Sequence, residues 1–185
     1  MNISKFGGIG WDGADEFERA YGMTLPMDYK EFLAKYNGGD TPNTEFHSRR
    51  NGSDVRWFFG VGDVKQSFHS LPLEEWLEHG VLPVAEDSYG NYFVMDVSKT
   101  PGQMYLSDHE EGFTLIPLTG SFKEFIQKCK SEKVDMELAT MPIEERERRM
   151  IADGNGALIT DSLRACWQGF IDKYTGMVLE RVKLR

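Results

Sequence analysis

Four short apolar segments between residues 80 and 118 constrain the fold of this chain more than any other feature. They span residues 81–85, 92–97, 103–106 and 113–116. Turn-forming residues separate them, namely Ser88-Tyr89-Gly90-Asn91, Pro101-Gly102 and Glu111-Gly112. Short strands with such short connections are typical of an antiparallel meander. The pattern therefore predicts a sheet whose consecutive strands lie side by side.

Two helices are predicted ahead of this meander, over residues 12–20 and 26–36. Pro26 suits the first position of the second helix, because its missing N–H has no intrahelical partner there. Asn37-Gly38-Gly39 follows that helix and can supply a left-handed stop. The second helix carries one apolar stripe, made of Tyr29, Phe32, Leu33 and Tyr36. It has a face for packing and no reactive group.

Three further elements are predicted between this helix and the meander. Residues 41–53 are polar and contain Pro, Asn and Gly, which predicts a surface loop. The aromatic run within residues 54–61 predicts a mostly buried strand. Residues 63–79 are predicted to be helical, with a break at Pro72.

From residue 121 onward three helices are predicted, with a loop over residues 153–156 before the last. Ser121 and Glu124 fit a capping box that opens a helix, and a highly charged helix is expected over residues 142–152. Thr160 can cap a final helix, whose apolar stripe is Leu163, Trp167, Phe170, Ile171 and Tyr174. This stripe needs a surface, which can be the rest of the chain, a partner or a second copy in a homodimer.

The predicted organisation is therefore one domain over residues 1–131 and a helical extension over residues 132–185 that packs on it. With 40% hydrophobic residues, the chain has enough apolar side chains for a real core. No segment approaches the ~20 apolar residues of a membrane-spanning helix, and no signal peptide is recognised at the N-terminus. We therefore expect a cytoplasmic protein that has no membrane partner.

Charge limits the kinds of partner. The chain has 21 basic and 30 acidic residues, a net charge of −9. A general nucleic-acid binder needs a basic footprint, so direct nucleic-acid binding is not expected. Residues 81–120 contain six acids and one base, a local charge of −5, whereas residues 121–185 have a charge of +1. An acidic surface near the meander can steer a basic partner, although solvated charge without a partner explains the same pattern.

No metal site or cofactor is expected. The four histidines lack ligand spacing, and a zinc site needs about four converging ligands. The two cysteines, Cys129 and Cys166, lie far apart, and each is predicted to be a buried free thiol within a helix.

The residues best placed for function lie in the turns of the meander. They are Glu86, Asp87, Tyr89, Asp108, His109, Glu110 and Glu111. Carboxylate pairs or an Asp-His couple can perform acid–base catalysis, but solvated charge is ordinary at strand ends. We therefore interpret this set as a partner-binding surface and predict no catalytic residue. The alternative interface is the polar stretch around residues 41–53.

A resemblance to a known family connects these features. The matching residues are the run from Gly22 to Leu33 with its Tyr36-Asn37-Gly38-Gly39 end, then the run from Leu82 to Asp87. Gly90-Asn91-Tyr92 and Asp96 follow, then Tyr105, Asp108-His109-Glu110 and the run from Ser121 to Ile126. In this order and spacing, over about residues 12–130, the chain resembles the Smi/Knr-type domain of the SUKH superfamily. Residues from about 131 onward lie outside the resemblance.

The resemblance implies both a fold and a function. The implied fold is α+β, with one twisted, mainly antiparallel sheet flanked by helices. Bacterial members are similar to immunity proteins that bind and neutralise a cognate polymorphic or contact-dependent toxin, often a nuclease. The family has no shared catalytic residues, so a binding role without catalysis is implied. A regulatory adaptor, like the fungal cell-wall-assembly regulators of the same superfamily, is the alternative.

Overall fold

The computed structural model describes residues 1–48, 52–99, 101–110 and 114–185. These residues form two compact units, one of residues 1–132 together with 179–185, and one of residues 133–178. The sequence analysis assigned residues 132–185 to a single extension. In the structure, residues 179–185 instead belong to the first unit, where Glu180 and Arg181 pair with its first strand.

The elements of the first unit are, in chain order, β1 (Asn2–Lys5), α1 (Gly10–Tyr21), α2 (Met27–Lys35), β2 (Gly39–Asp40), β3 (Thr44–His47), β4 (Gly52–Asp54), β5 (Trp57–Phe58), the 3-10 turn η1 (Phe68–Ser70), α3 (Leu73–Glu78), β6 (Val81–Glu86), β7 (Tyr92–Asp96), β8 (Met104–Ser107), β9 (Leu115–Thr119), α4 (Phe122–Lys128), β10 (Cys129–Ser131) and β11 (Glu180–Arg181). The second unit contains α5 (Met136–Ala139), α6 (Ile143–Ala152), the 3-10 turn η2 (Gly156–Leu158) and α7 (Asp161–Tyr174).

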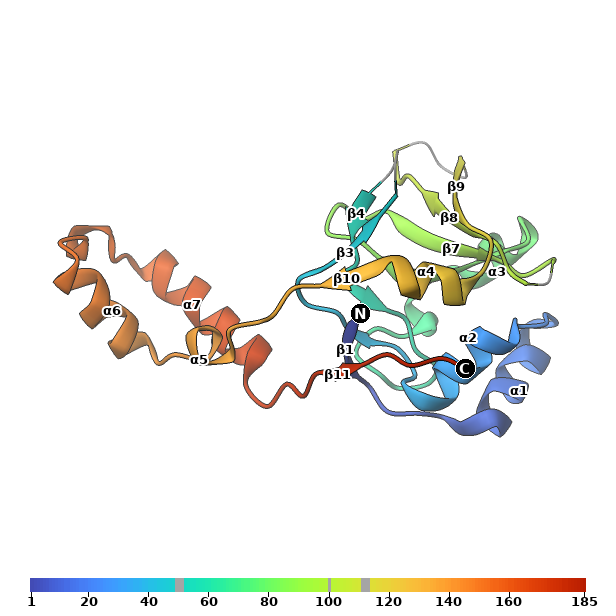
Figure 1. Cartoon of the computed structure of the whole chain (residues 1–185), viewed down its shortest axis with the longest axis horizontal. Helices are drawn as coiled ribbons and strands as arrows, with labels where there is room; N and C mark the ends of the chain where they lie inside the picture. The colour runs from blue at the N-terminus through green and yellow to red at the C-terminus, as the bar shows by residue number, and fades with distance from the viewer. Residues whose placement is uncertain (49–51, 100, 111–113) are drawn as a thin grey trace. The chain divides into compact units, whose positions relative to one another are not determined.

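The strands of the first unit form two antiparallel sheets. The larger has the order β11-β1-β2-β5-β6-β7-β8-β9, and the smaller has the order β10-β3-β4. Strands β6 to β9 are consecutive neighbours in the larger sheet, so the predicted meander is confirmed (Figure 1). Of the predicted strand 113–116, residue 113 lies outside the described residues, and β9 contains the last two. The fold is α+β as predicted, with a second, small sheet that the sequence analysis did not include.

The small sheet arises where a surface loop was predicted, so that prediction is wrong for residues 44–47, 52 and 53. Thr44 and Phe46 are buried in β3, while Glu45 and His47 alternate with them on the exposed face. This period-2 alternation is the signature of a half-buried strand. Residues 49–51 of the predicted loop lie outside the described residues.

Two other local predictions also need correction. Residues 63–67 are not helical, and only η1 and the short α3 lie within the predicted helix 63–79. The predicted strand 54–61 is interrupted, because only its first residue lies in β4 and only Trp57 and Phe58 form β5. The hydrophobicity of residues 54–61 predicted burial, and Phe58 and Phe59 are indeed buried. Hydrophobicity does not predict which of these residues pair with a neighbouring strand.

An aromatic core holds the larger sheet against α2 and α4. The ring of Phe122 lies 5.2 Å from that of Phe32 and 4.8 Å from that of Tyr29, and Phe125 lies 5.1 Å from Phe93 between ring centroids. Such edge-to-face and tilted pairs add to the free energy gained by burial alone. A smaller cluster around Trp76 brings α3 against Val81 and Val94. The strands β6 and β7 are therefore buried on both faces.

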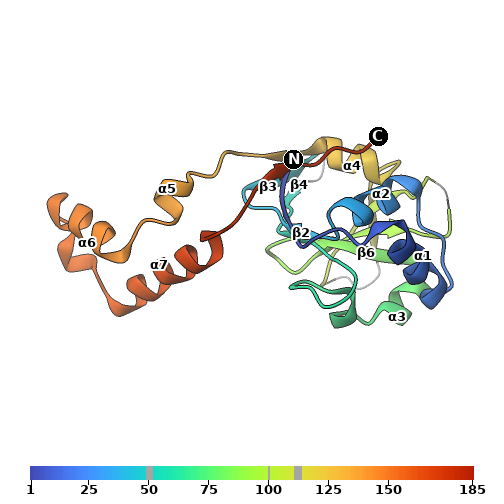
Figure 2. The same cartoon turned by 90° about the horizontal axis from the view of Figure 1, so that it is seen from below.

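The start of α4 follows the predicted chemistry, whereas Pro26 precedes the first residue of α2 and does not occupy that position. The hydroxyl of Ser121 accepts a hydrogen bond from the N–H of Glu124 at 3.1 Å, and the Glu124 carboxylate accepts one from the N–H of Gly120 at 3.0 Å. Without these two side-chain acceptors, the N–H groups of Glu124 and Gly120 would be unpaired at the start of α4. Helices α1 and α2 lie side by side and are joined by Lys30, which forms ion pairs with Asp15 and Glu18 (Figure 2).

Tyr29 and Tyr36 differ in how their buried hydroxyls are satisfied. The Tyr29 hydroxyl has no hydrogen-bond partner among the described residues, and burial raises its pKa. The Tyr36 hydroxyl accepts a hydrogen bond from the N–H of Lys183 at 2.9 Å. Because an unpaired buried hydroxyl opposes folding, we expect Tyr29→Phe to raise the free energy of unfolding by about 1 kcal/mol. We expect Tyr36→Phe to lower it by about 1 kcal/mol.

Urea denaturation of both variants beside the wild-type chain checks this pair. The matched substitutions remove one oxygen from each of two buried tyrosines, so the difference in sign isolates the hydrogen bond. Equal destabilisation by both changes would contradict the assignment of Tyr29 as unpaired.

The second unit is a small helical assembly. Glu147 of α6 and Arg164 of α7 form an ion pair at 2.6 Å, and the guanidinium of Arg146 lies 5.9 Å from the ring centroid of Trp167. The N–H of Leu163 donates to the Thr160 hydroxyl at 3.2 Å, so the predicted cap is confirmed. Of the predicted apolar stripe of α7, Tyr174 is buried, Phe170 is 48% exposed, and Leu163, Trp167 and Ile171 are half-buried.

The two cysteines differ from each other. Cys129 is buried, as predicted, but it lies in β10 and not within a helix, and burial raises the pKa of its thiol to about 12. Cys166 is exposed, so the prediction of a buried thiol is wrong. Cys166 lies on the open side of α7, next to exposed Ala165 and near exposed Gly169, and its apolar neighbours in the sequence point elsewhere.

Candidate partner-binding site

Asp87 organises the turn between β6 and β7. It is fully buried, and its Oδ1 accepts hydrogen bonds from the N–H groups of Tyr89 at 2.9 Å and Asn91 at 2.8 Å. Its Oδ2 accepts from the Asn91 amide at 2.9 Å and the Ser53 hydroxyl at 2.7 Å. A buried carboxylate is tolerated when its lone pairs are satisfied in this way. Asp87 therefore shapes the candidate surface from beneath and is not presented to a partner.

Glu86 lies half-buried beside an aromatic side chain. It is paired with Trp57 across the β5–β6 ladder, and the guanidinium of Arg56 lies 4.2 Å from the centroid of the Trp57 ring. Burial and the neighbouring Asp87 charge raise the pKa of Glu86, while the Arg56 charge opposes them. Unlike Asp87, this carboxyl group retains some contact with solvent. It lies at the margin of the surface formed around the β6–β7 turn.

Tyr89 is the exposed apolar side chain of the turn, with 73% of its surface accessible. The preceding residue, Ser88, joins the turn to β4, because its N–H donates to Asp54 Oδ1 at 3.1 Å and its hydroxyl donates to the second oxygen of that carboxylate. The backbone below Tyr89 is thus fixed from two sides, by Asp54 and Asp87. An exposed aromatic on a fixed backbone is a suitable anchor for a protein partner.

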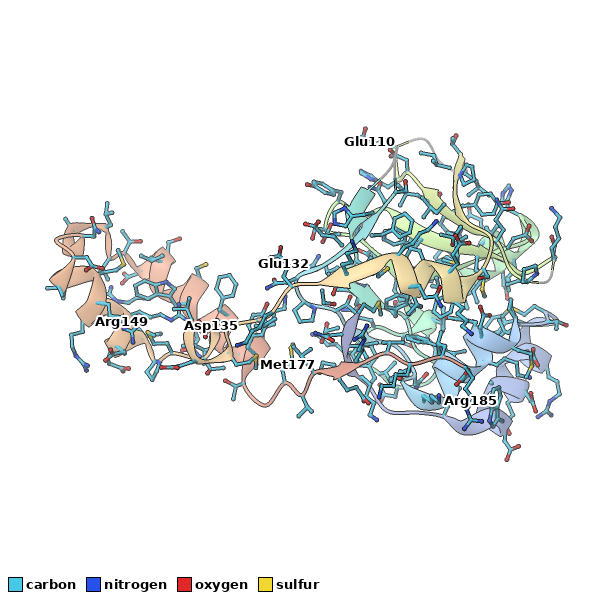
Figure 3. All side chains as sticks on the ribbon, in the orientation of Figure 1. Glu110, Glu132, Asp135, Arg149, Met177 and Arg185 are labelled. Carbon is cyan, nitrogen blue, oxygen red and sulfur yellow. The ribbon has the colours of Figure 1, made fainter. Side chains whose placement is uncertain are left out.

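The loop after β8 is tied to the same turn. The N–H of His109 donates to Asn91 Oδ1 at 3.1 Å, and the His109 ring nitrogen Nδ1 lies 2.9 Å from that oxygen. Asp108 accepts a hydrogen bond from the N–H of Glu110 at 2.8 Å. Glu110 lies beyond the end of β8, with 82% of its side chain exposed (Figure 3). Glu111, the last predicted site residue, lies outside the described residues.

The alternative interface adjoins this one. A shallow depression of about 420 Å³ is lined by residues of β3, β4 and the β6–β7 turn, namely Glu45, Phe46, His47, Gly52, Ser53, Asp54, Ser88 and Tyr89. Glu45 and His47 form an exposed pair at 2.9 Å on its wall. Thr41 and Thr44 are buried, so they do not contribute to an interface. The structure thus joins parts of both predicted surfaces around Tyr89.

Sequence reasoning missed Glu45 and Asp54 as members of this surface. The exposed position of Glu45 could have been predicted from the alternation of polar and apolar residues along Thr44-Glu45-Phe46-His47. Asp54 had no such signal, because its position depends on the long-range contact between β4 and Ser88. We define the turn surface as the exposed or partly exposed residues Glu45, Asp54, Tyr89, Asp108, His109 and Glu110.

The described residues contain no cluster of three or more His, Cys, Asp or Glu side chains placed to hold a metal ion. Within the same described part of the chain, no helix has the length and apolar character needed to cross a bilayer. The turn surface presents charged groups, the aromatic side chain of Tyr89 and hydrogen-bonding groups, all on backbone that is already ordered.

Comparison with known proteins gives two matches. The model of the SMI1 / KNR4 family (SUKH-1) matches residues 14–128, which run from within α1 to the end of α4. The SPbeta prophage-derived uncharacterized protein YokK of Bacillus subtilis (strain 168) is 27% identical over 146 residues, covering 65% of this chain and 74% of the relative. The family match includes the turn surface and ends before the second unit.

Proposed function

This chain belongs to the SMI1 / KNR4 family (SUKH-1), and from that premise we propose that it is an immunity protein. It binds a cognate polymorphic or contact-dependent toxin and neutralises it by covering its working surface, without catalysing a reaction. The toxin is basic, and a nuclease fits best, because a nuclease holds phosphates in a basic groove. The observation that carries the proposal is the turn surface, where exposed carboxylates surround Tyr89 on a backbone fixed by Asp87.

The proposed binding depends on a turn surface that is complementary in charge to a basic toxin and that changes little in structure when the toxin binds. Asp54, Asp108 and Glu110 attract a basic partner and speed the encounter. Tyr89 then supplies a desolvated anchor, since aromatic residues at the centre of an interface account for much of its affinity. Because four hydrogen bonds to Asp87 hold the turn before binding, little ordering entropy is lost in the complex.

Co-expression with the toxin candidate encoded next to this gene tests the proposal. We expect growth to be restored and the two proteins to co-purify as a stable complex. Failure of both rescue and binding, with both proteins shown to be folded, would exclude immunity against that toxin. It would favour a regulatory adaptor function.

Charge reversal tests the turn surface itself. We expect Asp108→Lys combined with Glu110→Lys to slow association with the toxin about tenfold, because the encounter loses its electrostatic attraction. The dependence of the association rate on salt should become shallower for the same reason. Stopped-flow or surface-based kinetics at several salt concentrations measures both effects.

The matched control is Glu74→Lys combined with Glu75→Lys on α3. Both of these glutamates are exposed, and the pair produces the same change in net charge away from the turn surface. We expect association to slow by no more than about twofold in this control. Equal slowing in the two double variants would show that only the net charge matters and would remove the turn surface as the interface.

A further inference from the structure

A basic groove runs along the first unit between α4, β10 and the segment that follows β11. It has a volume of about 960 Å³ and is lined by Met1, Asn2, Lys123, Ile126, Gln127, Cys129, Lys130, Ser131, Arg181, Val182, Lys183 and Leu184. Among the described residues, its lining contains four cationic side chains and no Asp or Glu. The floor is apolar, because Ile126, Cys129 and Val182 are all buried. On a chain with a net charge of −9, this is a marked local reversal of sign.

The lysines of this groove differ from the other lysines of the first unit. Each lysine elsewhere in that unit has a carboxylate oxygen within 3.5 Å, and these are Lys5, Lys30, Lys35, Lys65, Lys99 and Lys128. In the described part of the chain, Lys130, Arg181 and Lys183 have no carboxylate partner. Lys123 donates to a main-chain oxygen of Arg185 at 2.6 Å.

One acid that could neutralise the groove is already engaged. Glu45 lies directly opposite Lys130 in the β3–β10 ladder. Its carboxylate instead lies 2.9 Å from Nε2 of His47 on its own strand. Within the described residues, Glu45 therefore forms no ion pair with Lys130.

The walls of the groove are held in place by hydrogen bonds. The N–H of Asn2 donates to the Ser131 hydroxyl at 2.7 Å, which ties β1 to β10. The segment after β11 is fixed to α2, because the N–H of Lys183 donates to the Tyr36 hydroxyl at 2.9 Å and the N–H of Arg185 donates to Glu31 at 2.9 Å (Figure 3). A groove formed before binding loses little entropy when it is filled.

We propose that this groove binds an acidic segment of a partner protein, with carboxylates at the basic rim and an apolar side chain on the floor. Charge complementarity with the four basic side chains supports this occupant. A single-stranded nucleic acid fits less well, because such sites combine cations with aromatic side chains on which bases stack, and none of the described residues that line the groove is aromatic. The groove shares no lining residue with the turn surface, so the inference extends beyond the proposed toxin contact.

Binding of a fluorescein-labelled peptide of alternating glutamate and leucine, followed by anisotropy on the full chain, tests the proposal. We expect affinity that falls as salt rises, and a loss of about tenfold in Lys130→Glu combined with Arg181→Glu. The matched control, Lys65→Glu combined with Lys99→Glu, makes the same change in net charge at two exposed lysines outside the groove. We expect the control to retain affinity within about twofold.

Three results would overturn the proposal. They are an absence of peptide binding by the wild-type chain, equal weakening in the groove and control variants, and tighter binding of a uridine oligonucleotide than of the peptide. Thermal unfolding of each variant checks that it is folded. If the charge reversal disrupts β10, Lys130→Ala combined with Arg181→Ala replaces it, because this variant introduces no new charge. We expect it to weaken peptide binding about threefold.

Discussion

Replacing Asp87 with alanine is expected to lower the free energy of unfolding by about 3 kcal/mol and to disorder the turn surface. Four donors point at this one buried carboxylate, from Tyr89, from Asn91 twice and from Ser53. Without it, four partly buried donors lose an acceptor that water replaces only in part, which is the costly case for a hydrogen bond. Urea denaturation measures the loss of stability.

The effect of Asp87→Ala should extend to the next loop. Asn91 uses its amide nitrogen to donate to Asp87 and its amide oxygen to bind His109. Once the Asp87 carboxylate is removed, the amide is free to rotate away from His109. We therefore expect the amide signals of Tyr89 and His109 both to shift in NMR spectra of the folded variant.

The matched control for Asp87→Ala is Asp108→Ala in the neighbouring turn. Asp108 is half-exposed and accepts one hydrogen bond, from the N–H of Glu110. Its replacement should change the free energy of unfolding by less than about 1 kcal/mol, because water can take over the exposed donor. Similar losses in the two variants would mean that Asp87 is not the organising residue.

Gly39→Ala is expected to have the other large effect, lowering the free energy of unfolding by about 4 kcal/mol. Gly39 has a φ of +149°, and a Cβ there would lie 2.5 Å from the backbone oxygen of Ser4 and 2.9 Å from the Cα of Lys5. These atoms belong to β1, which pairs with β2 at this point, so neither strand can move without breaking the ladder. Such a loss is a large fraction of the stability of an ordinary domain.

Gly120→Ala is the control for this substitution, because Gly120 also lies in the first unit. A Cβ there would meet only Glu124 Oε2, at 3.6 Å, which is ordinary van der Waals contact. We expect its free energy of unfolding to stay within about 0.5 kcal/mol of the wild-type value. If Gly39→Ala proved equally mild in the same urea titration, the close approach of β1 and β2 would be refuted.

The elements predicted correctly are those whose signals lie within a few residues. The helix after Pro26 forms because its apolar stripe and its stop are adjacent, and Asn37, with φ of 48°, provides the left-handed residue. The capping interaction of Ser121 and Glu124 is likewise a contact over three residues. The meander follows the same logic, since each hairpin joins neighbouring segments.

The elements predicted wrongly depend on contacts between distant residues. Strand β3 pairs with β10, and Thr44 shares a hydrogen bond of 2.6 Å with Ser131, so the alternation along β3 could not identify β10 as its partner. Strand β1 is covered by β11 in the same way, with Ile3 paired to Glu180. The pairing of strands far apart in sequence is set by the packing of the whole unit and not by propensity.

The α+β fold, the gathering of acidic residues in the turns of the meander and the likeness to SUKH-type domains could all be predicted before the structure was known. These properties depend on residue type, spacing and order. Which acids face solvent depends on the folded chain, because burial and hydrogen bonding separate Asp87 from Asp108 and Glu110. It also decided that basic residues from α4, β10 and the segment around β11 share one groove, since folding alone brings such distant side chains together.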